Sequence, residues 1–349
     1  MSGILALARP EIVALKAYSH ASWDEGFDRL HANELPWRAE TDRSLAGLNR
    51  YPEPHPYALA QRLAELYGVE AAQLLPGRGS DESIDLVVRG FCRAGIDNVI
   101  ICPPTFGMYS VAARIQGAEV REVPLLRAQG YALDTQAVLA ACDDNTRVVF
   151  LCSPNNPTGN VMAPAAMEQV LQKLVDKALV VVDEAYIEFS GDASLTKALD
   201  RFSNLVVLRT LSKAFGLAGA RVGSLIASAE IVALLSKVIP PYSIPQLTIE
   251  AVLATLAPPQ LAVQRERVAQ VRLERERVCA ALAGKHSVRK LWPSVTNFLL
   301  ADFTDARSTL AAARAAKLLI RDMRNVSPDS LRISVGTPEQ NDRLLRSIP

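Results

Sequence analysis

The sequence predicts an α/β fold in which a large domain with a mainly parallel, doubly wound sheet precedes a smaller α+β domain. Two observations lead to this prediction. Between residues 99 and 208, short apolar runs alternate with segments of helical spacing, as in parallel strands joined by crossover helices. Beyond residue 240 the pattern changes to a long, charged helix followed by shorter strands and helices. A length of 349 residues and an apolar fraction of 49% allow two such domains.

Apolar runs predict the strands of the large domain, and the helical spacing of Leu59, Leu63 and Leu66 predicts a helix before them. The expected strands are 99–102, 119–123, 148–152, 179–182 and 205–208, and the expected helices between them are 111–116, 134–141 and 164–177. Ligands of such open sheets bind at the carboxyl ends of the strands. We therefore expect functional residues in the loops that follow these strands.

The segment P-P-Y-S-I-P at 240–245 predicts a boundary between the two domains. Helices are expected at 246–256 and 258–283, followed by strands at 288–291, 297–301 and 331–335 and helices at 307–316 and 338–348. The large domain is then expected over 31–245 and the small domain over 246–349. Residues 1–30 are expected to form an N-terminal arm that contributes to the small domain.

Charge and composition exclude several classes of partner. The 38 basic and 37 acidic residues nearly balance, which favours neither nucleic acid nor an anionic membrane. The five cysteines are odd in number without C-x-x-C spacing, and the four histidines are scattered, so neither a disulfide framework nor a metal site is expected. The sequence begins without a signal peptide and has no apolar stretch of membrane-spanning length. We expect a cytoplasmic protein with small-molecule partners.

The stretch L-R-T-L-S-K-A-F-G-L-A-G-A-R-V-G, residues 208–223, is the most informative. Lys213 follows an apolar strand, where burial lowers the pKa of an amine and leaves the neutral nucleophile that forms a Schiff base with an aldehyde. The hydroxyl of Ser212 and the guanidinium of Arg221 suit a phosphate. Together they indicate pyridoxal 5′-phosphate (PLP). A solvated loop lysine and a surface arginine would explain the same residues taken alone.

A second apolar run, A-L-V-V-V-D-E-A-Y at 178–186, supplies Asp183 and Tyr186. A carboxylate at the carboxyl end of a strand can pair with the protonated nitrogen of the PLP ring and keep the ring an electron sink. Tyr186 can reach the phenolate oxygen of the ring. An N-cap of a helix is the alternative for Asp183, but its occurrence together with Lys213 favours the cofactor.

Other loops at the same edge add candidates, each with a simpler alternative. In L-L-P-G-R-G-S-D-E, a glycine-containing turn leads to Ser80 and Asp81, where free amides bind phosphate or the side chains merely cap a helix. Tyr109 can lay its ring on a flat cofactor or pack in the core. Asn156 lies in the stiff turn S-P-N-N-P-T-G, and Tyr51 lies in the proline-rich L-N-R-Y-P-E-P-H-P. Turn formation and packing are their alternatives.

These segments resemble, in order and spacing, the fold-type I PLP-dependent aminotransferases. The motifs are S-P-N-N-P-T-G, V-V-D-E-A-Y-I-E-F, R-T-L-S-K-A-F-G-L-A-G-A-R-V-G and L-R-I-S-V-G-T, and the resemblance extends from Tyr18 to Thr337. The segments L-N-R-Y-P-E-P, R-G-S-D-E and P-P-T-F-G-M-Y-S-V are similar to the subgroup that acts on histidinol phosphate. The resemblance implies a seven-stranded type of sheet, PLP as cofactor and a homodimer.

The resemblance also implies a role for each matching residue. Lys213 would form the Schiff base and carry the proton, and Asp183 would bind the ring nitrogen. Asn156 and Tyr186 would flank the phenolic oxygen, and Tyr109 would stack on the ring. The cofactor phosphate would be held by Ser80, Asp81, Ser212 and Arg221, and by Tyr51 of the partner subunit. Phe106 stands where many relatives have tyrosine, and Ser80 where alanine is frequent.

The substrates follow from the same resemblance. Arg332 would grip an α-carboxylate in relatives, but histidinol phosphate has a phosphate ester on that arm, so Arg321 and Tyr18 would supply more donors. A surface ion pair with Asp322 is the alternative for Arg321. The implied reaction is a transamination that converts L-histidinol phosphate and 2-oxoglutarate into imidazole-acetol phosphate and glutamate in histidine biosynthesis. An aromatic amino-acid aminotransferase, a phosphothreonine decarboxylase-like lyase and a non-enzymatic PLP-binding regulator are the alternatives. The regulator would need an added helix-turn-helix domain.

Overall fold

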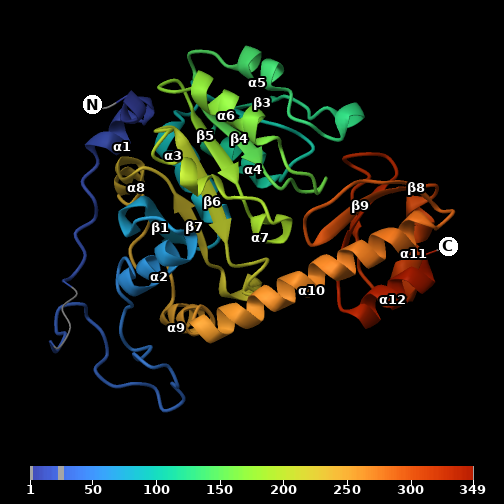
Figure 1. Ribbon diagram of the computed structural model, residues 1–349. Helices are drawn as coiled ribbons and strands as arrows, with labels where there is room; N and C mark the ends of the chain where they lie inside the picture. Colours follow the sequence, from blue (N-terminus) through green and yellow to red (C-terminus); the bar gives the residue numbers. More distant parts are fainter. Residues whose placement is uncertain (1–2, 23–26, 349) are drawn as a thin grey trace.

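A seven-stranded sheet organises the large body of the protein (Figure 1). The computed structural model describes residues 3–22 and 27–348. The strands are β1 (Leu74–Gly77), β2 (Asn98–Ile101), β3 (Glu119–Glu122), β4 (Thr146–Cys152), β5 (Leu179–Asp183), β6 (Leu205–Thr210) and β7 (Gly223–Ile226). Their order is β1-β7-β6-β5-β4-β2-β3. Strands β2 to β6 pair in parallel, whereas β7 is antiparallel to β1 and β6, so the predicted fold class is confirmed.

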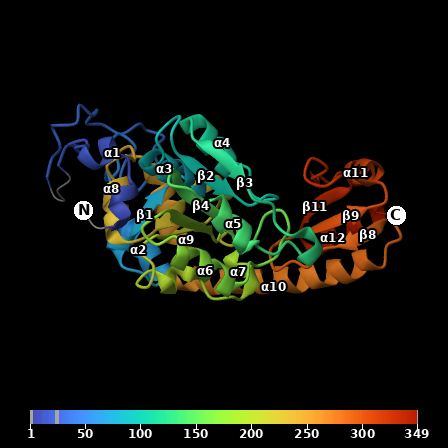
Figure 2. The ribbon, with the colours of Figure 1, turned by 90° about the horizontal axis from the view of Figure 1, so that it is seen from above.

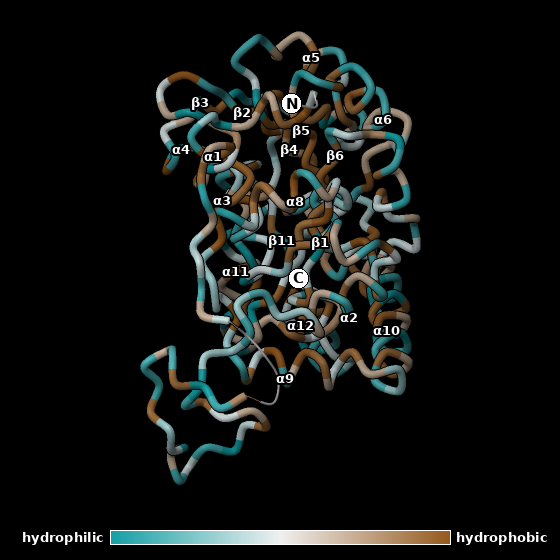
Figure 3. The backbone as a smooth tube through the Cα atoms, turned by 90° about the vertical axis from the view of Figure 1, so that its left-hand side faces the viewer, coloured by the Kyte–Doolittle hydropathy of each residue, from teal (hydrophilic) through white to brown (hydrophobic). Residues whose placement is uncertain are grey.

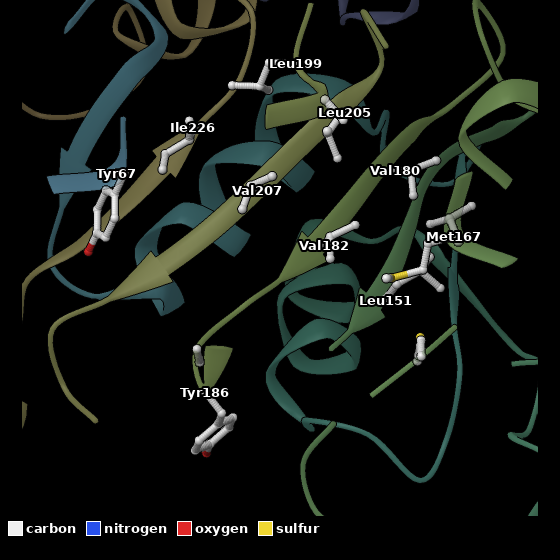
Figure 4. Close-up of a cluster of buried hydrophobic side chains, with 14 of the residues drawn as sticks. Tyr67, Leu151, Met167, Val180, Val182, Tyr186, Leu199, Leu205, Val207 and Ile226 are labelled. Atoms are coloured by element: carbon white, nitrogen blue, oxygen red, sulfur yellow. The ribbon is translucent and has the colours of Figure 1, made fainter. Parts of the chain in front are cut away.

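Both faces of this sheet are buried because its central strands are almost wholly apolar. Side chains alternate along a strand, so Val180 and Val182 enter one core cluster and Val181 enters the other (Figure 4). The first face is covered by α2 (Tyr57–Tyr67), α5 (Thr135–Ala141), α6 (Pro164–Lys173) and α9 (Gln246–Thr255). The second face is covered by α3 (Ser80–Phe91), α4 (Met108–Gln116) and α8 (Ala229–Leu235). This double cover leaves the strand ends as the places where polar side chains gather.

The small body is built on an antiparallel sheet of four strands in the order β10-β11-β9-β8. Its strands are β8 (Val288–Leu291), β9 (Phe298–Phe303), β10 (Arg321–Asp322) and β11 (Ser330–Ser334), and its helices are α11 (Ala306–Ala315) and α12 (Pro338–Ser347). A separate apolar cluster, which includes Leu299, Leu331 and Leu344, forms its core. The predicted α+β character of this part is confirmed.

One long helix, α10 (Pro258–Ala283), joins the two bodies and runs along both of them (Figures 1 and 2). Val268 belongs to the core of the large body, whereas Val278 and Leu282 belong to the core of the small body. Because α9 also packs on the large body, the core of the small body begins within α10 rather than at residue 246. The expected domain limits of 31–245 and 246–349 therefore stay a proposal based on the sequence.

The described residues at the start of the chain, from Ile4 to Val13, pack on the large body. Ile4 and Ala8 enter the core beneath α3 and α8, and the backbone N–H of Arg9 donates to the carbonyl of Gly90 at 3.0 Å. Helix α1 (Pro10–Ala14) follows, and Lys237 donates to the carbonyl of Val13. The expectation that the arm contributes to the small domain is thus corrected, because apolar residues at its start have partners on the large body.

Between α1 and α2, residues 15–22 and 27–56 contain no helix or strand and extend away from the large body as a loop (Figure 3). Several large apolar side chains of this loop are exposed, among them Leu30 at 92% and Trp37 at 74%. Its backbone is held by ion pairs, including Glu34 with Arg29 and Arg50 at 2.8 and 2.9 Å. The loop is therefore shaped by polar contacts while its apolar side chains face outward.

Among the described residues, none of the helices combines the length and the apolar character needed to cross a membrane. The same residues contain no group of three or more metal-ligating side chains. All five cysteines lie in the described part of the chain as free thiols.

Candidate active site

A cavity of about 640 Å³ lies at the carboxyl ends of the parallel strands, where the small body faces the sheet. Loops after β2, β4, β5 and β6 contribute its floor, and β10, β11 and the loop between them contribute one wall. The predicted site residues that line it are Ser80, Asp81, Asn156, Asp183, Tyr186, Ser212, Lys213, Arg221, Arg321 and Arg332. Segments far apart in sequence are thus brought to one place.

Asp183 is the last residue of β5 and is only 3% exposed. Its Oδ2 accepts a hydrogen bond from the Tyr109 hydroxyl at 2.7 Å, and its Oδ1 accepts one from the Ala185 backbone N–H at 3.1 Å. Burial raises the pKa of the carboxyl to about 6, although these hydrogen bonds and the charge of Lys213 act in the opposite direction. The fold therefore buries a carboxylate, and a cation next to it would offset the unfavourable desolvation of its charge.

Lys213 lies in the loop after β6, at the mouth of the cavity. Its side chain is exposed to the open cavity, which differs from the expected buried lysine. Its pKa is nevertheless lowered, because the surrounding protein desolvates the ammonium and the Arg332 guanidinium repels it. The Nζ atom lies 5.7 Å from the centre of the Tyr186 ring. These surroundings favour the neutral amine that nucleophilic attack and proton transfer require.

Tyr109 does not face the cavity, so its expected stacking on a cofactor ring is contradicted. Its side chain is fully buried, and its ring is stacked on Phe150 with centroids 4.7 Å apart and planes 6° apart. Helix α4 begins at Met108, which turns Tyr109 toward the core, whereas Phe106 precedes the helix and lines the cavity. Phe106 is thus an aromatic residue of the cavity wall that was not assigned to the site from the sequence, although its aromatic character and its place in the family pattern were visible there.

Asn156 follows β4 and Tyr186 follows β5, and both line the cavity in which the resemblance places the phenolic oxygen. The turn that carries Asn156 is held by its neighbour Asn155, whose amide donates to the Pro104 carbonyl at 2.8 Å. The Asn156 side-chain oxygen accepts a hydrogen bond from Arg332 of the small body. Tyr186 packs edge-on against Phe298 at 5.1 Å. Both site residues are thus fixed by contacts with other elements.

The phosphate-binding part of the cavity is the meeting point of α3 and the loop after β6. Arg221 contacts the Ser212 hydroxyl at 3.4 Å and the Asp81 carboxylate at 3.1 Å, so the three side chains converge. Ser80 is the first residue of α3, whose free amides attract an anion. A Cβ on Gly79 would lie 2.7 Å from the Arg221 guanidinium, and Gly79 has a φ of +84°. The positive φ favours glycine at this position.

Gly223 supports the same arrangement from β7 and was missed in the sequence. A Cβ there would lie 2.6 Å from the Gly79 carbonyl carbon and from the Ser80 nitrogen. The glycine therefore lets β7 approach the start of α3. An amine, a buried carboxylate and a cradle of amides, hydroxyls and a guanidinium match the aldehyde, ring nitrogen and phosphate of PLP, so the donor set fits this cofactor.

The small body brings two arginines to the cavity. Arg332 lies on β11 above the Phe298 ring, with its guanidinium carbon 5.3 Å from the ring centre, and burial lowers its pKa. Arg321 lies opposite it in the register of β10 and β11. Asp322, the ion-pair partner considered for Arg321, instead contacts Arg324 at 2.6 Å. The two arginines give this end of the cavity a positive charge.

Tyr18 and Tyr51 lie outside the cavity of their own chain, on the exposed loop. Tyr51 is 52% exposed and Tyr18 is 71% exposed. The Tyr51 ring stacks on Tyr242 with centroids 4.8 Å apart, and Tyr18 lies close enough to Tyr242 to raise the pKa of its phenol, with burial the larger cause. The structure thus gathers these tyrosines away from the other predicted residues.

Comparisons with known proteins identify relatives over nearly the whole chain. Residues 31–348 match the family described as "Aminotransferase class I and II". A protein of Xanthomonas euvesicatoria pv. vesicatoria named histidinol-phosphate aminotransferase is 48% identical over 99% of this chain and 97% of its own length.

Solved structures show the same fold. A histidinol-phosphate aminotransferase from Sinorhizobium meliloti in complex with pyridoxal-5′-phosphate is 25% identical, with a TM-score of 0.76 over 86% of this chain and 83% of its own. An L-threonine-O-3-phosphate decarboxylase from Porphyromonas gingivalis is 24% identical, with a TM-score of 0.73 over 86% of this chain and 90% of its own. The fold alone therefore serves more than one reaction.

Proposed function

Because the chain belongs to the class I and II aminotransferase family, we propose that it transfers the amino group of L-histidinol phosphate to 2-oxoglutarate. The products are imidazole-acetol phosphate and glutamate, and the pathway is histidine biosynthesis. The relative that is 48% identical supports this substrate by its name. The observation that carries the choice within this chain is the pair of arginines, Arg321 and Arg332, that line the same cavity as Lys213.

The reaction uses PLP, which when bound supplies a carbonyl for the amino group and a ring that withdraws negative charge from the reacting carbon. Asp183 holds the proton of the ring nitrogen, because a buried carboxylate favours a cationic partner. With PLP bound, Asn156 and Tyr186, which line the cavity, would donate hydrogen bonds to the ring oxygen. The amine of Lys213 takes the proton from the substrate Cα, for which its lowered pKa prepares it.

Anion binding divides between the two ends of the cavity. At one end, Ser80, Ser212 and Arg221 hold the cofactor phosphate, while the Asp81 carboxylate orients the Arg221 guanidinium at 3.1 Å. At the other end, Arg321 and Arg332 bind the phosphate ester of histidinol phosphate or a carboxylate of glutamate. A doubly charged phosphate has room for both guanidinium groups, since its three oxygens accept several hydrogen bonds.

The proposal includes a homodimer in which Tyr51, and with it Tyr18, complete the site of the partner subunit. This is supported by the position of both tyrosines on an exposed loop, outside the cavity of their own chain. Exposed apolar side chains on the same loop, such as Leu30 and Trp37, need a covering surface. The proposal places the enzyme in the cytoplasm, where its free thiols would stay reduced.

A comparison of amino donors tests the proposed substrate. Arg321→Ala is expected to lower kcat/KM for histidinol phosphate about ten- to a hundredfold, because a charge-assisted contact to the phosphate is lost. Phenylalanine, if it is a substrate, should lose much less. Arg324→Ala is the matched control, because Arg324 pairs with Asp322 and does not line the cavity. Steady-state kinetics with both donors and both variants give the measurement.

Two outcomes would contradict the proposal. Equal losses for phosphorylated and unphosphorylated donors would remove the phosphate-binding role of Arg321. Release of carbon dioxide from phosphothreonine, without stoichiometric keto acid, would identify a lyase instead. Glutamate formation from histidinol phosphate and 2-oxoglutarate would exclude that lyase as the main activity.

A further inference from the structure

The strongest contact of the buried carboxylate Asp183 comes from Tyr109, a residue whose stacking role the structure contradicts. The Tyr109 hydroxyl donates to Oδ2 at 2.7 Å. Its ring is held between Phe150, stacked at 4.7 Å, and Phe106, edge-on at 5.7 Å. Because the ring is fully buried between these two partners, its hydroxyl has one fixed position.

Asp183 depends on such a donor for its charge. Burial favours the neutral acid and the Asp81 charge acts in the same direction, whereas the Lys213 charge favours the carboxylate. The Ala185 backbone N–H satisfies Oδ1 at 3.1 Å, and the Tyr109 hydroxyl satisfies Oδ2. A carboxylate oxygen has two lone pairs, so each oxygen keeps one acceptor position for the ring nitrogen. A neutral Asp183 would offer a proton to the ring nitrogen instead of receiving a hydrogen bond from it.

We propose that Tyr109 is a positioning residue whose hydroxyl keeps Asp183 ionised and oriented, so that Asp183 can bind the protonated ring nitrogen of PLP. Tyr109 itself does not line the cavity, so it acts through Asp183. The inference rests on the proposed role of Asp183 and not on the choice of substrate.

Tyr109 is suited to this task because its own hydroxyl stays protonated. Burial and the neighbouring Asp183 charge raise the pKa of the phenol well above its ordinary value. The hydroxyl therefore remains a donor. The thiol of Cys152 lies opposite Asp183 in the β4–β5 register, donates to the Pro154 carbonyl at 3.5 Å and also interacts with the Tyr109 hydroxyl. A thiol is also a weak donor and does not replace the phenol.

The test is Tyr109→Phe, which keeps the ring and removes the hydroxyl. The holoenzyme is prepared with PLP labelled with ¹⁵N in the ring, and the ¹⁵N chemical shift is followed against pH by solid-state NMR. We expect the ring nitrogen to lose its proton at a pH about one to two units lower than in the wild type. The dissociation constant of PLP from the apoprotein should rise about ten- to a hundredfold.

Val111→Ala is the control, because Val111 lies on the same helix as Tyr109 and lines the cavity, and its truncation leaves the Tyr109 hydroxyl and both ring partners of Tyr109 in place. This variant should show the ¹⁵N titration of the wild type. An unchanged titration in Tyr109→Phe would overturn the proposal, as would an equal displacement in Val111→Ala. If Tyr109 had only a structural role, the ¹⁵N titration would shift equally in the test variant and in the control variant.

A second substitution covers the case in which Tyr109→Phe does not fold. Replacing Tyr109 with 3-fluorotyrosine keeps the hydroxyl and makes it a stronger donor, so the ring nitrogen should stay protonated to a higher pH. A titration identical to that of the wild type would overturn the proposal. Failure of histidinol phosphate as a substrate would leave both titrations as expected, so the two proposals can fail separately.

Discussion

Asp183 is a buried carboxyl group whose ionisation is unfavourable in the folded protein. Its carboxyl has a pKa raised to about 6 by burial, against which the Tyr109 and Ala185 hydrogen bonds act. A carboxyl with a raised pKa in the folded state binds its proton more tightly there than in the unfolded chain. The carboxyl therefore stabilises the apoprotein most at low pH, and this contribution is lost as the pH rises through about 6.

Asp183→Asn should accordingly make the apoprotein more stable at pH 8 than at pH 4, relative to the wild type. The difference between the two pH values should approach about 3 kcal/mol, from a shift of roughly two pKa units at about 1.4 kcal/mol each. Urea unfolding of both apoproteins at the two pH values gives the measurement. The amide's different hydrogen bonding is independent of pH and cancels in the comparison. A constant difference in stability would contradict the assigned pKa.

Asp97 provides a control of opposite sign. It is also buried, which by itself raises the pKa, but hydrogen bonds from Arg93 and the charge of Arg147 lower it below the ordinary value. Its stabilising contribution is therefore present at neutral pH and is lost as the pH falls. Asp97→Asn should destabilise the apoprotein by nearly the same amount at pH 8 and at pH 4, because both values lie above the ordinary pKa of 3.8, and by less only at more acidic pH. The two variants thus distinguish the ionised Asp97, which stabilises the fold, from the ionised Asp183, whose burial is unfavourable.

At the scale of elements, α10 supports the loop that carries Lys213. The Gln264 side-chain amide donates to the backbone carbonyl of Ala214, the residue after the lysine. Phe215 is buried beside it, and the loop closes through Leu217 N–H to the Leu211 carbonyl at 3.1 Å. The helix that carries the small body therefore also positions the reactive amine.

Gln264→Leu should loosen this loop without removing a residue from the cavity. Loss of one hydrogen bond of about 1 kcal/mol predicts amide exchange about fivefold faster in the segment 211–217. Hydrogen–deuterium exchange measured by mass spectrometry reports this segment directly. Gln270→Leu is the control, because Gln270 lies on the exposed side of α10. Equal exchange in the two variants would show that α10 does not hold the loop.

The elements were predictable from sequence where their own residues decided the structure. The apolar strands β4, β5 and β6 and the long helix α10 appear close to their expected limits, because burial on both faces and continuous helical composition mark them. Strands β1 and β7 were missed. Each is four residues long and includes glycine, and β1 also contains Pro76, so pairing with each other and not their own propensity makes them strands.

The candidate site was predictable in its residue types but not in every orientation. Motifs after β5 and β6 indicated Asp183 and Lys213, because strand ends meet at one edge of the sheet. Phe106 and Tyr109 are both aromatic and only three residues apart, and the start of α4 between them decides which one faces the cavity. The position of Tyr51 could not be predicted from its neighbouring residues either. It depends on how the exposed loop that carries Tyr51 is placed in the folded chain.

At the scale of the whole molecule, the cavity of one chain lacks Tyr18 and Tyr51, which the family resemblance assigns to the site. We expect mixed dimers of Tyr51→Ala and Lys213→Ala subunits to recover activity that neither parent has at limiting PLP. One site of such a dimer then has both defects, and the other has neither. Subunit exchange followed by activity measurement is the test. Activity no higher than that of the parents, in dimers confirmed by mass spectrometry, would show that each chain uses its own tyrosine.

Helix α10 has a mechanical consequence for the cavity. At 26 residues it is about 39 Å long, so rotating it by about 5° about its start would move its far end by about 3 Å. That displacement is as large as a whole hydrogen-bond length. The first part of the helix contacts the Lys213 loop, and its last part belongs to the core of the body that carries Arg321 and Arg332. Substitutions that change the bend of α10 between these two parts should therefore change the distance between the amine and the arginines without touching either.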